Sequence, residues 1–99
     1  MKLRDYCLSE THTRSRHKAR VFRSSLGLTA IDAELLRQTL LDAGRDRQDE
    51  LRSAGVDAFG QRYILDFTMT TSVGTATIRS AWIVKAGEGV LRFTSCYVL

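Results

Sequence analysis

The stretch that decides the fold is Q-R-Y-I-L-D-F-T-M-T-T-S-V-G-T-A-T-I-R-S-A-W-I-V-K, residues 61–85. Large apolar side chains recur at every second position from Tyr63 to Met69, and the residues from Thr75 to Lys85 alternate again. This two-residue period is typical of β-strands, and the polar run around Gly74 indicates a turn between them. We therefore expect two antiparallel strands. The residues expected on one face of the second strand are Ala76, Ile78, Ser80, Trp82 and Val84.

The residues on either side of this pair of strands extend the sheet. Gly87 and Gly89 indicate a second turn, and residues 90–98 predict a closing strand. A first short strand is possible around residues 51–56. The charged run R-D-R-Q-D-E at residues 45–50 is compatible with a solvated loop, a helix extension or an exposed edge.

Two helices are expected before the sheet. The first begins near Thr13 or Ser15, either of which could cap it, and Gly27 ends it in the left-handed conformation that glycine tolerates. The second starts at Thr29, where Asp32 completes a pattern similar to a capping box, and it stops at Gly44. Residues expected to face inward from the first helix are Ala19, Val21, Phe22 and Leu26, and the apolar face of the second comprises Ile31, Leu35, Leu36, Leu40 and Leu41.

The predicted class is therefore α+β, with two N-terminal helices packed on a three- to four-stranded antiparallel sheet. With 99 residues, the chain has room for a single domain, residues 1–99, with a helical part at 13–44 and a strand part at 50–99. The absence of proline and of repeats argues against linkers and solenoids.

Composition narrows the function and the compartment. No stretch is apolar enough to cross a bilayer, so we expect no membrane partner and a cytoplasmic location. Cys7 and Cys96 lack the spacing of a zinc site or a disulfide framework, so we expect two reduced thiols, no metal and no cofactor. The pI near 9.5 favours an anionic partner, for which nucleic acid is the better candidate.

The basic residues concentrate near the N-terminus. Residues 1–27 contain seven Lys and Arg against two Asp and Glu, whereas residues 28–60 are acidic overall. We interpret the run from His12 to Arg23 as a phosphate-binding face. The residues expected to contact nucleic acid in this general way are His12, Arg14, Arg16, Arg20, Arg23 and Arg62.

The chain resembles two groups of proteins. The first is a small bacterial family of unassigned function, through Lys18-Ala19 with Phe22 and Leu26-Gly27, Gly60 with Tyr63, Arg79 with Trp82-Ile83-Val84, Arg92, and Ser95 to Tyr97. The second is similar in layout alone: the metal-independent ribonuclease fold of barnase, EndoU, colicin nuclease domains and RelE-type toxins. There, His17-Lys18 and Ser95 with Tyr97 match a motif of toxins in that group. The resemblance implies an RNA-cleaving toxin and an acidic antitoxin or immunity protein as its partner.

Each candidate catalytic residue near the N-terminus has two interpretations. His17 is suited to take the 2′-hydroxyl proton of RNA, because an imidazole titrates near neutral pH, or it is a surface histidine. Lys18 holds a phosphate, or it is a solvated lysine. Either way, both residues lie on the expected basic helix.

The strand residues are also open to two interpretations. Arg79 and Arg92 on adjacent strands would stabilise the charge of a phosphoryl transition state, or Arg79 pairs with Asp66 across the sheet. Tyr97 stacks on a base, donates a proton to the leaving oxygen, or is a core residue, while Ser95 would bond the phosphate. A regular strand separates Arg92 from Ser95 and Tyr97, so a bulge is needed to bring them to one face.

The sequence thus supports an RNA-binding, toxin-like domain that cleaves RNA without a metal. The alternative is a noncatalytic interaction or nucleic-acid-binding module of a toxin–antitoxin or phage-encoded pair. A homodimer paired through the last strand is a third possibility, because that strand would lie at a sheet edge.

Overall fold

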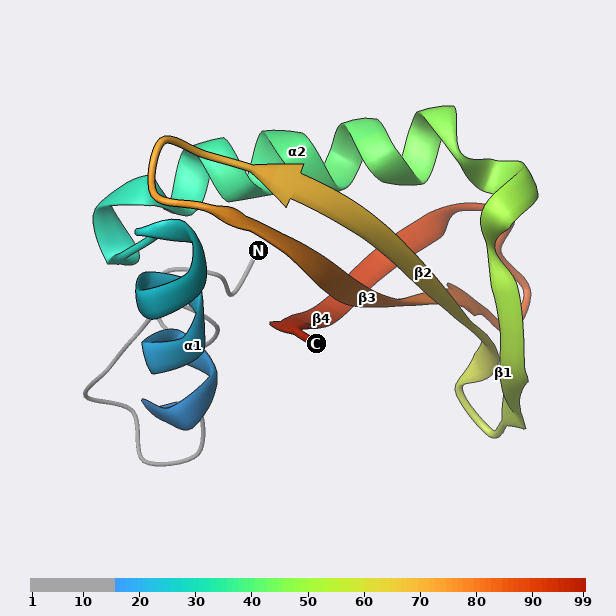
Figure 1. Cartoon of the computed structure of the whole chain (residues 1–99). Coiled ribbons are helices and arrows are strands. Elements are labelled where there is room, and N and C mark those ends of the chain that lie inside the picture. The colour runs from blue at the N-terminus through green and yellow to red at the C-terminus, as the bar shows by residue number, and fades with distance from the viewer. Residues whose placement is uncertain (1–15) are drawn as a thin grey trace.

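The computed structural model describes residues 16–99, with side chains from Lys18 onward. Two helices precede a four-stranded antiparallel sheet whose strands follow one another in the order β1-β2-β3-β4, which confirms the α+β class (Figure 1). The predicted start of the first helix at Thr13 or Ser15 lies outside the described residues. The elements are α1 (Arg16–Leu26), a 3-10 turn (Ala30–Asp32), α2 (Ala33–Asp46), a second 3-10 turn (Gln48–Glu50), β1 (Arg52–Asp57), β2 (Gly60–Thr70), β3 (Thr75–Lys85) and β4 (Leu91–Val98).

One face of the sheet forms the core with the helices. Leu65, Phe67 and Met69 of β2 are buried there, as alternation predicts, beside Ile78 and Trp82 of β3. Figure 1 shows α2 along one side of the sheet and α1 at the end nearest the turn between β2 and β3. The residues that the helices and their connection bury in this cluster are Phe22, Leu26, Leu28, Leu36, Leu40 and Ala43.

The first helix ends as predicted and is fastened to the sheet at that point. Gly27 has a φ of 70°, and its amide donates to the Arg23 carbonyl, closing the last turn. The Thr71 hydroxyl in the turn between β2 and β3 donates to the Leu26 carbonyl at 2.7 Å. These contacts fix the direction in which α1 leaves the sheet, and hence the position of Lys18 at its other end.

The predicted stop of the second helix at Gly44 is wrong, because α2 continues to Asp46. Gly44 is buried, and a Cβ placed there would lie 2.7 Å from Cη2 of Trp82. The residue is therefore a contact point where the indole packs on the helix backbone, and not a C-cap. The run at 45–50 is partly a helix extension, one of the three alternatives open from sequence.

The predicted apolar face of the second helix is too wide. Ile31 is 92% exposed and Leu35 is 52% exposed, whereas Leu36 and Leu40 are fully buried. Ile31 lies in the 3-10 turn before α2, where Thr29 and Asp32 form the predicted capping box. The change from 3-10 to α geometry rotates Ile31 away from the stripe that faces the sheet.

Three further sequence-based expectations concern composition. Cys96 is buried on the core face, and Cys7 lies outside the described residues. Within residues 16–99, no helix combines the length and apolar character needed to cross a bilayer. In the same part of the chain, no three His, Cys, Asp or Glu side chains gather closely enough to hold a metal ion.

Candidate nucleic-acid interface

The face of the sheet opposite α2 carries four arginines, and we call it the arginine face: Arg52, Arg62, Arg79 and Arg92, with Asp66, Ser95 and Tyr97. A bulge in β4 brings the last strand into this arrangement. Ala81 pairs with Ser95 but Trp82 pairs with Phe93, so Thr94 is the extra residue. Its hydroxyl donates to the Ala81 carbonyl at 2.9 Å. The bulge places Arg92 on the same face as Ser95 and Tyr97.

The register arranges this face in three rows across β2, β3 and β4. The first is Asp66, Arg79 and Tyr97; the second is Ile64, Ala81 and Ser95; the third is Arg62, Ile83 and Arg92. Rows on one face are two residues apart, which is about 6.6 Å along a strand. Ile83 in the third row is only 5% exposed, and its neighbours in the row are arginines, whose long stems can cover apolar surface.

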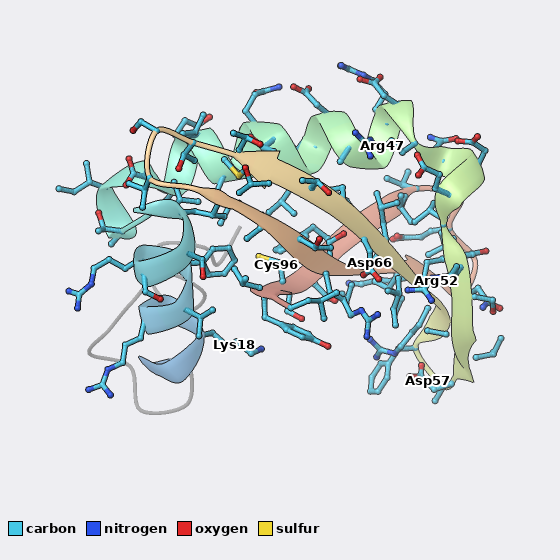
Figure 2. All side chains as sticks on the ribbon, viewed as in Figure 1. Lys18, Arg47, Arg52, Asp57, Asp66 and Cys96 are labelled. Carbon is cyan, nitrogen blue, oxygen red and sulfur yellow. The ribbon has the colours of Figure 1, made fainter. Side chains whose placement is uncertain are left out.

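An ion-pair network occupies the first row. Nε and Nη2 of Arg79 each donate to a different oxygen of Asp66 at 2.9 Å, which is a bidentate pair. Nη2 of Arg52, from the diagonal position on β1, donates to Asp66 Oδ2 at 2.9 Å. Figure 2 shows Arg52 and Asp66 lying close together. The ion pair between Arg79 and Asp66 is therefore present. Its two hydrogen bonds hold the Arg79 guanidinium in the middle of the face.

Tyr97 continues the row to α1. The hydrogen bond to Asp66 and, second, that to Tyr97 raise the pKa of Arg79 above its ordinary value. On the other side, Nζ of Lys18 lies 5.5 Å from the centroid of the Tyr97 ring, within cation–π range. A pocket of about 260 Å³ lies at this junction, lined by Lys18, Val21, Tyr97 and Val98. Lys18, Arg79 and Tyr97 thus gather at one place.

Arg92 and Arg62 belong to the third row and have other partners. Nε of Arg92 donates to Glu88 at 3.0 Å, and Nε of Arg62 donates to Asp57 at 2.6 Å. Four residues of strand, about 13 Å, separate the first row from the third. In this arrangement Arg79 and Arg92 would contact different phosphates of one strand instead of converging on a single phosphate.

The remaining candidate site residues lie elsewhere on α1 and the sheet, or outside the described residues. His12 and Arg14 lie outside the described residues, and Arg16 and His17 are described only as backbone of α1. Arg20 and Arg23 are exposed on α1, and Ser95 is half-buried in the middle row. The catalytic and binding roles of all these residues stay predictions.

Two parts of the site were missed by sequence reasoning. Arg52 contacts a carboxylate 14 positions away, and only the pairing of β1 with β2 brings the two together. Val21 and Val98 line the pocket, but Val21 was expected in the core and Val98 was not singled out. The available signal for Arg52 was its position at the start of a possible strand. The alternation could not show which partner strand it meets.

The paired carboxylates make stability depend on acid pH. The pKa of Asp66 is lowered from 3.8, chiefly by its hydrogen bonds from Arg79, and Arg62 likewise lowers that of Asp57. A lowered folded-state pKa contributes stability above the unfolded value, and this contribution is lost as the pH falls through the folded-state pKa. The Tm should therefore fall steadily below about pH 4.

Thermal unfolding of Asp66→Asn from pH 7 to pH 2 measures the contribution of this carboxylate. We expect a lower Tm at pH 7 and a shallower decline with acid than in the unchanged protein. The exposed Asp49→Asn is the matched control, because it removes the same charge outside the network. Parallel Tm curves for Asp66→Asn and the unchanged protein would contradict this account.

Comparison with known proteins identifies a family. A family model described as Domain of unknown function (DUF6883) matches residues 1–99. No curated protein and no solved structure matches the chain. The evidence on function therefore comes from the arginine face itself.

Proposed function

The chain belongs to the DUF6883 family, and we propose that it binds RNA through the arginine face. The observation that carries the proposal is the gathering of Lys18, Arg79 and the exposed Tyr97 on a face that also presents Arg52, Arg62 and Arg92. An aromatic ring among basic side chains on a sheet is a common way of binding single-stranded nucleic acid. The opposite face is occupied by the core and α2.

The ion pairs on this face are compatible with phosphate binding. A guanidinium has five N–H donors, and Asp66 accepts two of those of Arg79, so others remain to reach a phosphate. The pairs of Arg62 and Arg92 are exposed to solvent, and such pairs contribute little to stability. At Arg62 and Arg92 a phosphate can therefore replace the carboxylate at low cost, whereas at Arg79 it would use the donors that Asp66 leaves open.

Cleavage of the bound RNA is a second candidate. It is favoured by the Lys18 ammonium, 5.5 Å from the centroid of the Tyr97 ring, and by Arg79, which pairs with Tyr97 across β3 and β4. The 2′-oxygen would attack phosphorus as the bond to the 5′-oxygen breaks, giving a 2′,3′-cyclic phosphate and a 5′-hydroxyl. His17 would accept the 2′-hydroxyl proton, and Tyr97 would donate one to the leaving oxygen. Arg79 and Lys18 would stabilise the charge that develops on the phosphoryl oxygens.

An acidic antitoxin or immunity protein is the protein partner that we propose for the same face. The arginines that would bind phosphates pair with carboxylates of the chain itself, which supports a partner rich in carboxylates. An acidic protein of this kind would compete with RNA for binding, whether or not the chain cleaves RNA.

One experiment tests binding and cleavage together. The full-length protein is incubated in EDTA with a fluorescent single-stranded RNA of 12 nucleotides, and anisotropy and product size are recorded at several salt concentrations. We expect log K to fall linearly with log salt. Three phosphate contacts, each contributing about −0.7, would give a slope near −2. Cleavage would appear as cyclic-phosphate products that are lost in Lys18→Ala and Arg79→Ala. Binding without products removes the cleavage proposal alone, and no binding at 50 mM salt removes both.

A further inference from the structure

We infer that the pocket beside Tyr97 takes one unpaired base, so that single-stranded RNA is the preferred ligand of the arginine face. The inference rests on the proposed RNA binding and specifies which form of RNA is bound and where. The pocket lies between the first part of α1 and the end of β4, at one end of the Asp66–Arg79–Tyr97 row. It is therefore continuous with the basic face.

The residues that line the pocket are suited to a flat, apolar group with an anionic group attached beside it. Val21 and Val98 contribute aliphatic surface, and the Tyr97 side chain is 36% exposed and adds an aromatic ring. Among the described residues of the lining, Lys18 contributes the charge, and Arg79 lies next to Tyr97 in the register. A nucleobase with its adjoining phosphate has this combination of a planar ring and a nearby anion.

The pocket has room for about one base. Its volume of about 260 Å³ lies below the roughly 300–1,000 Å³ typical of sites for drug-sized ligands. The bases of an A-form duplex are stacked and paired, so none can enter a pocket at the junction of a helix and a strand without leaving the stack. The geometry therefore selects against duplex RNA.

The contact between Lys18 and Tyr97 indicates how the site exchanges its occupant. The ammonium lies over the ring, 5.5 Å from its centroid and near the outer limit of a cation–π contact. A base that stacks on the ring would take this position. The flexible lysine side chain would then reach the phosphate of the same nucleotide.

The test compares one 12-nucleotide RNA as a single strand and as a blunt duplex, at equal salt, with the full-length protein. The unchanged protein should bind the single strand about tenfold more tightly than the duplex, because stacking of one base on an aromatic ring has an effect of this size. Tyr97→Leu should lose that preference, because the single strand then loses its stacking contact. Tyr97→Phe, which keeps the ring, should retain most of it.

The control is Phe59→Leu, which removes an aromatic ring that is 70% exposed at the turn between β1 and β2, away from the pocket. This variant should bind both RNAs as the unchanged protein does, and circular dichroism should show that all variants are folded.

A second measurement places a 2-aminopurine base in the single strand. Its fluorescence should be quenched on binding, and less so with Tyr97→Leu. Equal single-strand and duplex affinities in the unchanged protein, or unaltered preference in Tyr97→Leu, would overturn the pocket assignment. RNA binding would stand in both cases, and it fails only if neither RNA binds.

Discussion

Replacing Lys18, Arg79 and Arg92 together by glutamine should lower the affinity for single-stranded RNA about 100-fold at 0.1 M salt. Each lost phosphate contact makes the slope of log K against log salt shallower by about 0.7. Over the decade from about 1 M to 0.1 M salt, this lowers K by about fivefold. Three contacts multiply to about 100-fold, and the slope should become shallower by about 2 units. The measurement is anisotropy over a series of salt concentrations, which separates charge effects from the stacking contribution of Tyr97.

The matched control changes the same charge on the opposite side of the molecule. Arg37 and Arg45 lie on α2 and pair with Glu34 and Asp42, as Arg79 and Arg92 pair with Asp66 and Glu88. Figure 2 shows Arg47 beside α2, on the other side of the sheet from Lys18. The triple glutamine variant of Arg37, Arg45 and Arg47 should bind RNA within about threefold of the unchanged protein, since these residues would contact no phosphates. Equal losses in both triple variants would mean that net charge, and not the arginine face, governs binding.

The strands were the most predictable part of this fold, and the reason is physical. One face of β2 and β3 is buried against α2, and a two-residue period then fixes which side chains point inward. The same period placed Arg79 on the face opposite Ile78 and Trp82. It also allowed Asp66 as a partner for Arg79, because the two residues could lie on the same face of neighbouring strands. Whether they meet depends on the register that the turn sets.

The parts that sequence reasoning missed depend on contacts between distant segments. Gly44 would end an isolated helix, but here the Trp82 ring fills the space beside it, and α2 runs on. The sequence showed that a bulge was needed near Arg92, but not whether it forms. That depends on backbone pairing with β3, where Thr94 bonds the Ala81 carbonyl.

The candidate site was predictable in its members more than in its geometry. Lys18, Arg79 and Tyr97 were singled out separately, and the structure brings these three to one place. Arg92 shares the face but stands about 13 Å away along the strands. The distance follows from the register of β3 with β4, which no residue pattern within either strand determines.

Replacing Gly60 by alanine should lower the free energy of unfolding by about 3 kcal/mol, because two effects combine there. Gly60 begins β2 opposite Lys85, with a φ of 148°, where side chains are strained. A Cβ would also lie 2.2 Å from the Val84 carbonyl oxygen and 2.7 Å from Cα of Lys85. Both obstructing atoms are backbone of the neighbouring strand, so relief requires β2 and β3 to separate.

Two other glycines separate these causes in urea unfolding. Gly55 has a φ of 107° but no atom within 4 Å of a built Cβ, so Gly55→Ala should show strain alone, about 1 kcal/mol. Gly89 has neither feature, so Gly89→Ala should stay within about 0.5 kcal/mol of the unchanged protein. Equal losses in Gly60→Ala and Gly55→Ala would show that the close approach of β2 and β3 contributes nothing. The order Gly60, Gly55, Gly89 would instead show that β2 and β3 approach too closely for a side chain at this end of the sheet, where Arg62 and Arg92 stand in one row.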